Sequence, residues 1–225
     1  MQRIPEPELM DDPVQAAAYA AADFTEPHNM FVENFRETFF STDINGKVLD
    51  LGCGPADVSV RFARAYPRCV IHGVDGAEAM LRKGEIRLKR EELEDRISLF
   101  HGIIPGIDLP ERDYGVIISN SLLHHLHNPA GLWECVKNFS RKGTLVYLMD
   151  LKRPDNKQEA EGLVNTYSGD EPLVLKRDFF NSLCAAFSPE EVTTQLQSAG
   201  LNTLTVKVIS DRHMIIHGQI TNEQK

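Results

Sequence analysis

Two acidic residues and two glycines in the first third of the chain have the types and spacing to hold a small ligand. Asp50 ends an apolar run and precedes Gly52 and Gly54 in the stretch VLDLGCGPAD, residues 48–57. Glycines there let the backbone turn tightly and let a ligand approach closer than a Cβ atom would allow. Asp75 ends the next apolar run, where a carboxylate can accept hydrogen bonds from both ribose hydroxyls. Two such carboxylates suit a positively charged nucleoside.

The same glycines allow a rival interpretation as a dinucleotide site. A G-x-G-x-x-G pattern would use Gly52, Gly54 and position 57, with the pyrophosphate on the N-terminus of the following helix. Position 57 is an aspartate, whose charge repels a phosphate group at that place. The pattern therefore disfavours an NAD-linked dehydrogenase.

Strands must bring these residues to one edge of a sheet, and the pattern along the chain predicts them. Apolar runs indicate strands at 47–51, 69–74, 97–101, 114–120 and 144–151. Helical periodicity separates several of them, at 57–66, at 77–90, and from the Asn128-Pro129 cap to an expected stop at Gly143. Alternating strands and helices predict an α/β fold with a mostly parallel sheet, which binds ligands at the carboxyl ends of its strands.

Other segments flank this alternation. We expect residues 1–46 to form an N-terminal helical lid, with one helix capped by Asp12 and Gln15 and a second after the turn signal Thr25–Pro27. The main domain, residues 47–225, contains an insertion at about 152–187 with helical character. Insertions of this kind often shape a substrate site.

The end of the chain carries strong local signals. Ser188 and Glu191 have capping-box spacing around Pro189, which predicts a helix that Gly200 ends. Two β-rich runs, 201–209 and 212–218, follow and are expected to pair as a hairpin.

Composition narrows the possible partners. The 225 residues include 24 Lys and Arg against 33 Asp and Glu, a net charge of −9 that repels a phosphate backbone, so we expect no nucleic-acid partner. No apolar run approaches the roughly 20 residues of a membrane span, and the first residues lack the apolar core of a secretory signal. The four cysteines show no paired spacing. We expect a cytoplasmic protein with reduced thiols, no membrane partner, and a monomeric or homodimeric state.

Four stretches in order give the chain a family resemblance. VLDLGCGPAD, GVDGAEAML, ISNSLLHHLHNPAGLW and LVYLMDLKRP resemble successive motifs of the class I S-adenosylmethionine-dependent methyltransferases, over roughly residues 47–218. The resemblance implies a Rossmann-like, seven-stranded, mostly parallel sheet with an antiparallel last strand and helices on both faces. It also implies S-adenosylmethionine as the cofactor and S-adenosylhomocysteine as the product.

The resemblance also implies roles for individual residues at the strand ends. Members of the family hold the methionine part on the glycine loop, the ribose on the second acid, and the adenine near the loops that follow. The corresponding positions here are Asp50, Gly52, Cys53 and Gly54 for methionine, Asp75 for ribose, Gly76 and Met80 beside ribose and adenine, Gly102 and Ile103 for adenine, and Asn120, Ser121 and His125 at the methionine end or facing the transferred methyl. Ile103 stands where the family often has an acid that binds the adenine amine, so apolar packing and backbone groups would replace that contact. The usual third glycine of the loop is Ala56, a modest change if that position is already helical.

A histidine cluster follows the fourth strand of the main domain, at His124, His125 and His127. Three histidines could bind a metal, but no Asp, Glu or Cys lies at companion spacing, so we expect no metal site. Histidine has a pKa suited to a general base for a hydroxyl or protonated amine. We select His125 as the candidate catalytic residue, with a purely structural role as the alternative.

The sequence thus predicts a methyltransferase that acts on a small-molecule acceptor by direct in-line transfer. No Asn-Pro-Pro-Tyr-like tetrapeptide of the base-methylating relatives follows the fourth strand, which favours a non-base acceptor. A regulatory module that binds the cofactor without methyl transfer is the alternative, because the adenine-binding acid is absent.

Overall fold

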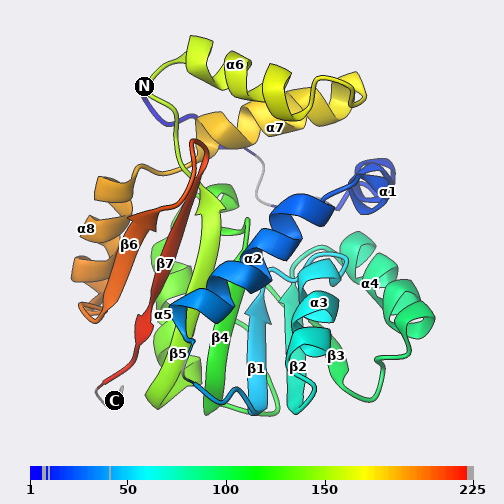
Figure 1. Cartoon of the computed structure of the whole chain (residues 1–225), viewed down its shortest axis with the longest axis vertical. Helices are drawn as coiled ribbons and strands as arrows, with labels where there is room; N and C mark the ends of the chain where they lie inside the picture. The colour runs from blue at the N-terminus through cyan, green and yellow to red at the C-terminus, as the bar shows by residue number, and fades with distance from the viewer. Residues whose placement is uncertain (7–8, 10, 41, 222–225) are drawn as a thin grey trace.

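The structure is a computed structural model that describes residues 1–6, 9, 11–40 and 42–221. Its centre is one sheet of seven strands: β1 (Gly46–Leu51), β2 (Cys69–Asp75), β3 (Ile97–His101), β4 (Tyr114–Asn120), β5 (Ser140–Leu151), β6 (Leu204–Val208) and β7 (His213–Gln219). They lie in the order β3-β2-β1-β4-β5-β7-β6 (Figure 1), and only β7 runs antiparallel to its neighbours. The predicted α/β fold with an antiparallel last strand is therefore confirmed.

The strand order reverses beside β1, and this positions the site. The chain moves outward from β1 through β2 to β3, then crosses to the other side of β1 with β4. Asp50 pairs with Gly73 of β2 and with Ile118 of β4, so the carboxyl ends of the three strands meet at one edge. Open α/β sheets bind ligands in the crevice at such a reversal.

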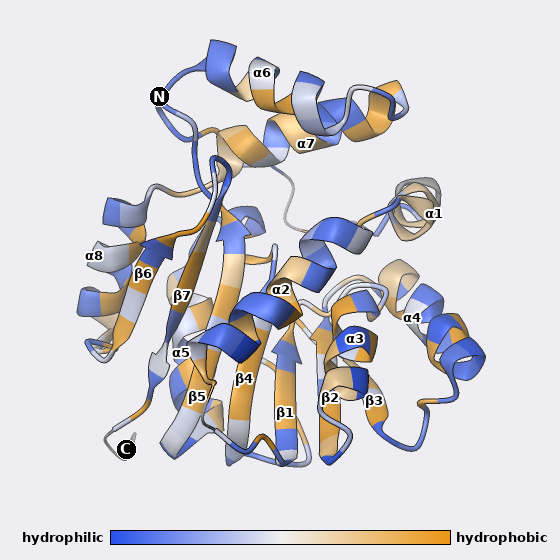
Figure 2. Cartoon of the chain, viewed as in Figure 1, coloured by the Kyte–Doolittle hydropathy of each residue, from blue (hydrophilic) through white to orange (hydrophobic). Residues whose placement is uncertain are grey.

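Helices cover both faces of the sheet (Figure 1). They are α1 (Pro13–Ala21), α2 (Thr25–Thr38), α3 (Asp57–Ala65), α4 (Glu78–Glu91), η1 (Leu123–His125), α5 (Ala130–Phe139), α6 (Lys157–Tyr167), α7 (Leu173–Ala185) and α8 (Pro189–Ala199). One apolar core joins the sheet to α2 and α3, and another joins its opposite face to α5 and α8. Figure 2 shows the apolar residues concentrated in the strands, with hydrophilic residues on the outer sides of the helices.

The two-helix insertion stands apart from both cores. Helices α6 and α7 lie above the carboxyl ends of the strands (Figure 1) and share a small apolar cluster that includes Leu163 and Leu183. An isolated bridge between Lys152 and Phe187 joins the two ends of the insertion. This arrangement places the predicted insertion directly over the edge of the sheet where Asp50 lies.

Two local predictions differ from the structure. Thr25–Pro27 is the first turn of α2 and not a preceding turn, because a proline in the first turn sacrifices only an N–H that has no helical partner. Helix α5 ends at Phe139 instead of running on to Gly143, because β5 begins at Ser140 and Gly143 lies within it at a φ of 94°. The proposed capping role of Gln15 concerns a side chain outside the described residues.

Helix α2 is more deeply packed than its place in a lid would suggest. Phe31 and Phe35 are fully buried against the sheet, and Phe35 stacks edge-on with Phe62 at 4.9 Å between ring centroids. Phe31 and Phe35 therefore belong to the core, whereas the lid itself stays a prediction. None of the described helices is long and apolar enough to cross a membrane.

Candidate functional site

One cavity of about 680 Å³ opens at the carboxyl ends of the strands. Every residue that the sequence selected for the site lines it: Asp50, Gly52, Cys53, Gly54, Asp75, Gly76, Met80, Gly102, Ile103, Asn120, Ser121 and His125. They come from four separate strand ends, so the sheet brings together what the sequence disperses. The volume falls within the roughly 300–1,000 Å³ range that is typical of small-molecule sites.

The loop after β1 has the conformation that its glycines permit. Gly52 and Gly54 have φ values of 73° and 51°, in the left-handed region that glycine occupies without penalty. A Cβ atom at Gly52 would lie 2.8 Å from Leu122, whereas one at Gly54 would meet nothing within 4 Å. Gly54 therefore faces open space that a ligand could fill.

Ala56 corrects one expectation about this loop. It is the residue before α3 and has a φ of 61°, so the position is left-handed and not yet helical. Glycine would be the less strained residue there, since a left-handed alanine costs about 1 kcal/mol. Ala56 is also fully buried in the core between the sheet and α3, where its methyl group contributes packing.

Asp50 lies under the loop with its side chain turned into the protein. It is 1% exposed, and its Oδ2 accepts a hydrogen bond of 2.5 Å from the hydroxyl of Ser59 on α3. Burial raises the pKa of Asp50 to about 7, with the nearby Asp75 charge adding to the effect and the Ser59 bond opposing it. A cationic ligand above this carboxylate would compensate for its lost hydration.

Asp75 holds the loop and still has acceptor capacity. Its Oδ2 accepts from the backbone N–H of Gly54 and its Oδ1 from that of Ala77, both at 2.8 Å. Burial raises the pKa of Asp75, while these two bonds favour its charged form. Each carboxylate oxygen accepts about two hydrogen bonds, so one position on each remains for a ribose hydroxyl.

Asn120, at the end of β4, offers an acceptor to the cavity. Among the described residues its Oδ1 is buried and has no hydrogen-bond partner. An orphaned buried carbonyl costs free energy unless a ligand or water donates to it. Its place between the glycine loop and Ser121, whose φ is 56°, suits an ammonium or other N–H donor of a bound ligand.

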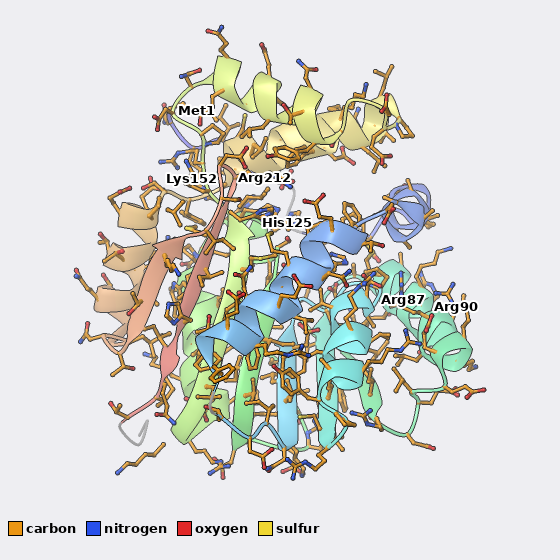
Figure 3. The ribbon with its side chains drawn as sticks, in the orientation of Figure 1. Met1, Arg87, Arg90, His125, Lys152 and Arg212 are labelled. Atoms are coloured by element: carbon orange, nitrogen blue, oxygen red, sulfur yellow. The ribbon has the colours of Figure 1, made fainter. Side chains whose placement is uncertain are left out.

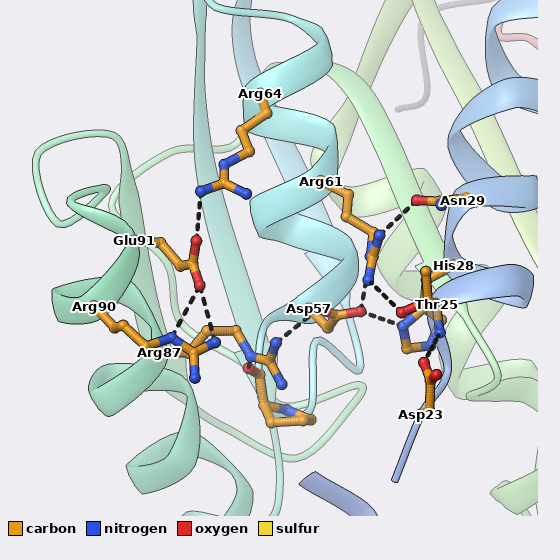
Figure 4. Close-up of polar contacts among 11 residues, drawn as sticks. Asp23, Thr25, His28, Asn29, Asp57, Arg61, Arg64, Arg87, Arg90 and Glu91 are labelled. Atoms are coloured by element: carbon orange, nitrogen blue, oxygen red, sulfur yellow. Dashed lines mark hydrogen bonds and ion pairs between the residues drawn. The ribbon is translucent and has the colours of Figure 1, made fainter. Parts of the chain in front are cut away.

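Asp57 places a carboxylate where a dinucleotide site would need to bind a pyrophosphate. Figure 4 shows its carboxylate between His28, Arg61 and Arg87, with 2.9 Å to Arg61 Nε and 2.7 Å to Arg87 Nη1. Burial opposes ionisation, but the bonds from His28 and Arg61 and the charge of Arg87 lower the pKa of Asp57 below its usual range. The network ties α2 and α4 to the first turn of α3 and keeps a negative charge where a phosphate would need to bind.

The part of the cavity beside Met80 and Ile103 is apolar and is covered by α1. Met80 is buried beside Tyr19 of α1, and Ile103 is 59% exposed at the cavity wall. Tyr19 also lines the cavity, and burial raises the pKa of its hydroxyl to about 12, so it stays protonated. These surroundings are compatible with packing on a base, without an acid for the adenine amine.

The two adjacent histidines of η1 have different environments. His124 is 3% exposed, and its Nδ1 lies 2.6 Å from Asp150 Oδ1 at the end of β5. Burial opposes the charged imidazolium, but the Asp150 carboxylate outweighs it and raises the pKa of His124. His125 faces the same cavity, with its Nδ1 3.3 Å from Glu6 Oε1.

Several residues at this end were missed by the sequence reasoning. Glu6 and Arg3 come from the N-terminal segment, and Arg3 donates to the carbonyl oxygens of His124 and Leu126, both at 2.9 Å. No local pattern could have revealed these contacts, because they depend on how the first residues cross the finished sheet. Figure 3 places His125 at the end of the sheet that faces α6 and α7, in the region of Lys152 and Arg212.

Comparison with known proteins agrees with this geometry. Residues 48–143 match the family model described as "Methyltransferase domain". Residues 48–143 of the chain therefore form a methyltransferase domain. The match spans the glycine loop, Asp75, His124 and His125, which are among the residues that line the cavity.

Relatives support the same assignment over part of the chain. A malonyl-[acyl-carrier protein] O-methyltransferase of Priestia megaterium is 30% identical over 46% of this chain and 35% of the relative. The chain covers little more than a third of the length of the first curated relatives that it matches, with shares of 38% and 35%.

Solved methyltransferases share the whole fold at low sequence identity. A SAM-dependent methyltransferase from Aquifex aeolicus has a TM-score of 0.67 at 16% identity, with 93% of this chain and 99% of that chain covered. The plantazolicin methyltransferase BpumL in complex with SAH has a TM-score of 0.71 at 14% identity, with 93% and 91% covered. The likeness extends beyond the matched domain to nearly the full chain.

The cavity fits the cofactor of this methyltransferase family. Asp75 could accept hydrogen bonds from the ribose, and Gly54 leaves space for a close approach of the cofactor. The buried Oδ1 of Asn120, which has no partner among the described residues, could accept a hydrogen bond from it. The sulfonium and ammonium of S-adenosylmethionine are cations, which suits the buried carboxylate of Asp50.

Proposed function

We propose that the chain transfers the methyl group of S-adenosylmethionine to a small-molecule acceptor. The observation that carries this proposal is that one cavity contains both the predicted cofactor residues and a second wall made by α6 and α7. A nucleophile held beside the cofactor forms a bond to the methyl carbon as the carbon–sulfur bond breaks, and S-adenosylhomocysteine leaves. The protein's main contribution to such a step is alignment of the two reactants in a closed site.

The acceptor end of the cavity supports a small, partly apolar molecule. Tyr167, Leu175 and Phe179 supply apolar surface, and Glu171 and Asp178 add polar groups. Helices α6 and α7 lie over this end (Figure 1), and residues of both helices line the cavity. The net charge of −9 also disfavours nucleic acid.

We assign the roles of the flanking segments within the same proposal. The lid would consist of the N-terminal residues that border the cavity, from Leu9 to His28, because Phe31 and Phe35 belong to the core. Residues 152–187 would bind the acceptor. The buried, free thiols of all four cysteines support a cytoplasmic location, and a monomer or homodimer is expected.

Methyl-labelled S-adenosylmethionine incubated with the protein and a metabolite extract tests the proposal. We expect label in one low-molecular-weight product, and much less of it when the Asp75→Ala variant replaces the wild type at limiting cofactor. Cofactor binding without any labelled product would favour the regulatory module instead. Label in RNA or protein alone would contradict the small-molecule acceptor.

A further inference from the structure

Glu6 brings a carboxylate to the two adjacent histidines of η1. Its Oε1 lies 3.7 Å from His124 Nε2 and 3.3 Å from His125 Nδ1, and the three ligand atoms all lie within 4.8 Å of one another. In a tetrahedral site with bonds of about 2.1 Å, ligand atoms are about 3.4 Å apart. Only small side-chain shifts would therefore bring all three atoms onto one ion.

Asp150 prepares His124 for such a role. It is hydrogen-bonded to Nδ1 at 2.6 Å and also accepts from the backbone N–H of Leu123 at 2.7 Å, so it is fixed in place. Nε2 of His124 is thereby directed away from Asp150 and toward Glu6. Metal-binding histidines usually have their second ring nitrogen held by a carboxylate in this way.

The charges around the cluster also favour a cation. Glu6 and Asp150 supply two carboxylates, and Asp178 on α7 adds a third negative charge close enough to act on Glu6. Arg3, a nearby cation, donates to the carbonyl oxygens of His124, Leu126 and Ala185. Ser182 donates to Glu6 at 3.0 Å and orients it.

We propose that Glu6, His124 and His125 bind a divalent zinc ion at the acceptor end of the cavity. Two imidazole nitrogens and one carboxylate are a ligand set of catalytic zinc sites, in which a fourth position stays open. The side chains are 12%, 3% and 15% exposed, so the ion would be largely buried. Both histidines line the cavity, so the open position would face the acceptor.

The sequence predicts no metal, and the proposed site differs from that prediction because one of its ligands is distant in sequence. The expectation rested on the missing Asp, Glu or Cys near the histidines, and the fold supplies that ligand from the N-terminal segment. Zinc binding itself does not depend on the proposed methyl transfer. The contact between the open zinc position and an oxygen of the acceptor does rest on the proposed methyl transfer.

Metal titration of the whole, untagged protein tests the site without cofactor or acceptor. After treatment with EDTA, the wild type is expected to bind one equivalent of Zn²⁺ with a rise in melting temperature. Co²⁺ as a substitute should give the visible absorption of a tetrahedral site with imidazole ligands. Glu6→Gln and His125→Gln should each weaken Zn²⁺ binding by at least tenfold, and their metal-free melting curves should show that they fold.

Two matched variants control for binding elsewhere. Glu171→Gln removes a carboxylate from the same cavity and His217→Gln an imidazole from β7, and both should bind Zn²⁺ as the wild type does. Absence of Zn²⁺ binding by the wild type would overturn the proposal, as would equal affinity in Glu6→Gln and His125→Gln. Loss of the metal with methyl transfer intact would refute only its contact with the acceptor.

Discussion

Replacement of Asp75 by alanine should weaken cofactor binding, and it also removes two hydrogen bonds that hold the glycine loop. The carboxylate already makes two backbone hydrogen bonds of 2.8 Å, to Gly54 and Ala77, and would accept two more from the ribose. A hydrogen bond to a charged group is worth about 1.5–3 kcal/mol, and water replaces part of it when the partner is lost. We expect a net loss of about 2 kcal/mol for the ribose pair, which is a roughly 30-fold rise in Kd.

Calorimetric titration with S-adenosylhomocysteine measures this change. Asp113→Ala is the matched control, because it removes the same charge from an exposed position just before β4, at the opposite edge of the sheet. An analogue without ribose hydroxyls separates the ribose contacts from the support of the loop. The wild type should prefer the parent compound, and Asp75→Ala should lose that preference. An unchanged Kd in a folded Asp75→Ala variant would refute the ribose assignment.

Further predictions concern pH and backbone. Burial raises the pKa of Asp50 to about 7, so in the free protein this carboxyl is protonated below pH 7. Binding of a cationic cofactor then releases a proton, and cofactor affinity should rise between pH 6 and 8. Equal Kd values across this range would contradict the prediction. Gly54→Ala should cost about 1 kcal/mol of unfolding free energy, since the φ of Gly54 is 51°. It should also lower cofactor affinity at least tenfold, because the new Cβ atom occupies the open space beside the loop. Unchanged affinity in calorimetry would exclude a close approach of the cofactor to Gly54. Glu92→Gly should stabilise the fold by about 0.5–1 kcal/mol, because Glu92 is exposed at the end of α4 with a φ of 55°. Urea unfolding that shows no increase in the free energy of unfolding would count against strain at this cap.

Local signals explain which elements could be predicted from the sequence. β3 and β4 lie at the predicted residues, because short apolar runs between polar segments have few alternatives. The capping box of Ser188 and Glu191 forms as expected, since both of its hydrogen bonds lie within four residues. Gly143 does not end α5 as predicted. A left-handed glycine can lie inside an irregular strand as well as at the end of a helix, and only the pairing of β5 with β4 decides which occurs.

The same distinction between local signals and tertiary contacts applies to the residues of the site. Asp50 and Asp75 could be assigned because strand ends in a parallel sheet meet at one edge whatever the remaining packing. The partners that tune them could not, because Ser59 reaches Asp50 and Glu6 reaches His124 only through the tertiary fold. The strained conformation of Ala56 was likewise invisible in the sequence pattern.

Calorimetric titration of the purified chain with S-adenosylhomocysteine, and in parallel with NADH, tests the central claim most directly. The cavity should bind one S-adenosylhomocysteine per chain and no NADH, because Asp57 keeps a negative charge at the turn where a pyrophosphate would lie. Binding of NADH without binding of S-adenosylhomocysteine would contradict the account.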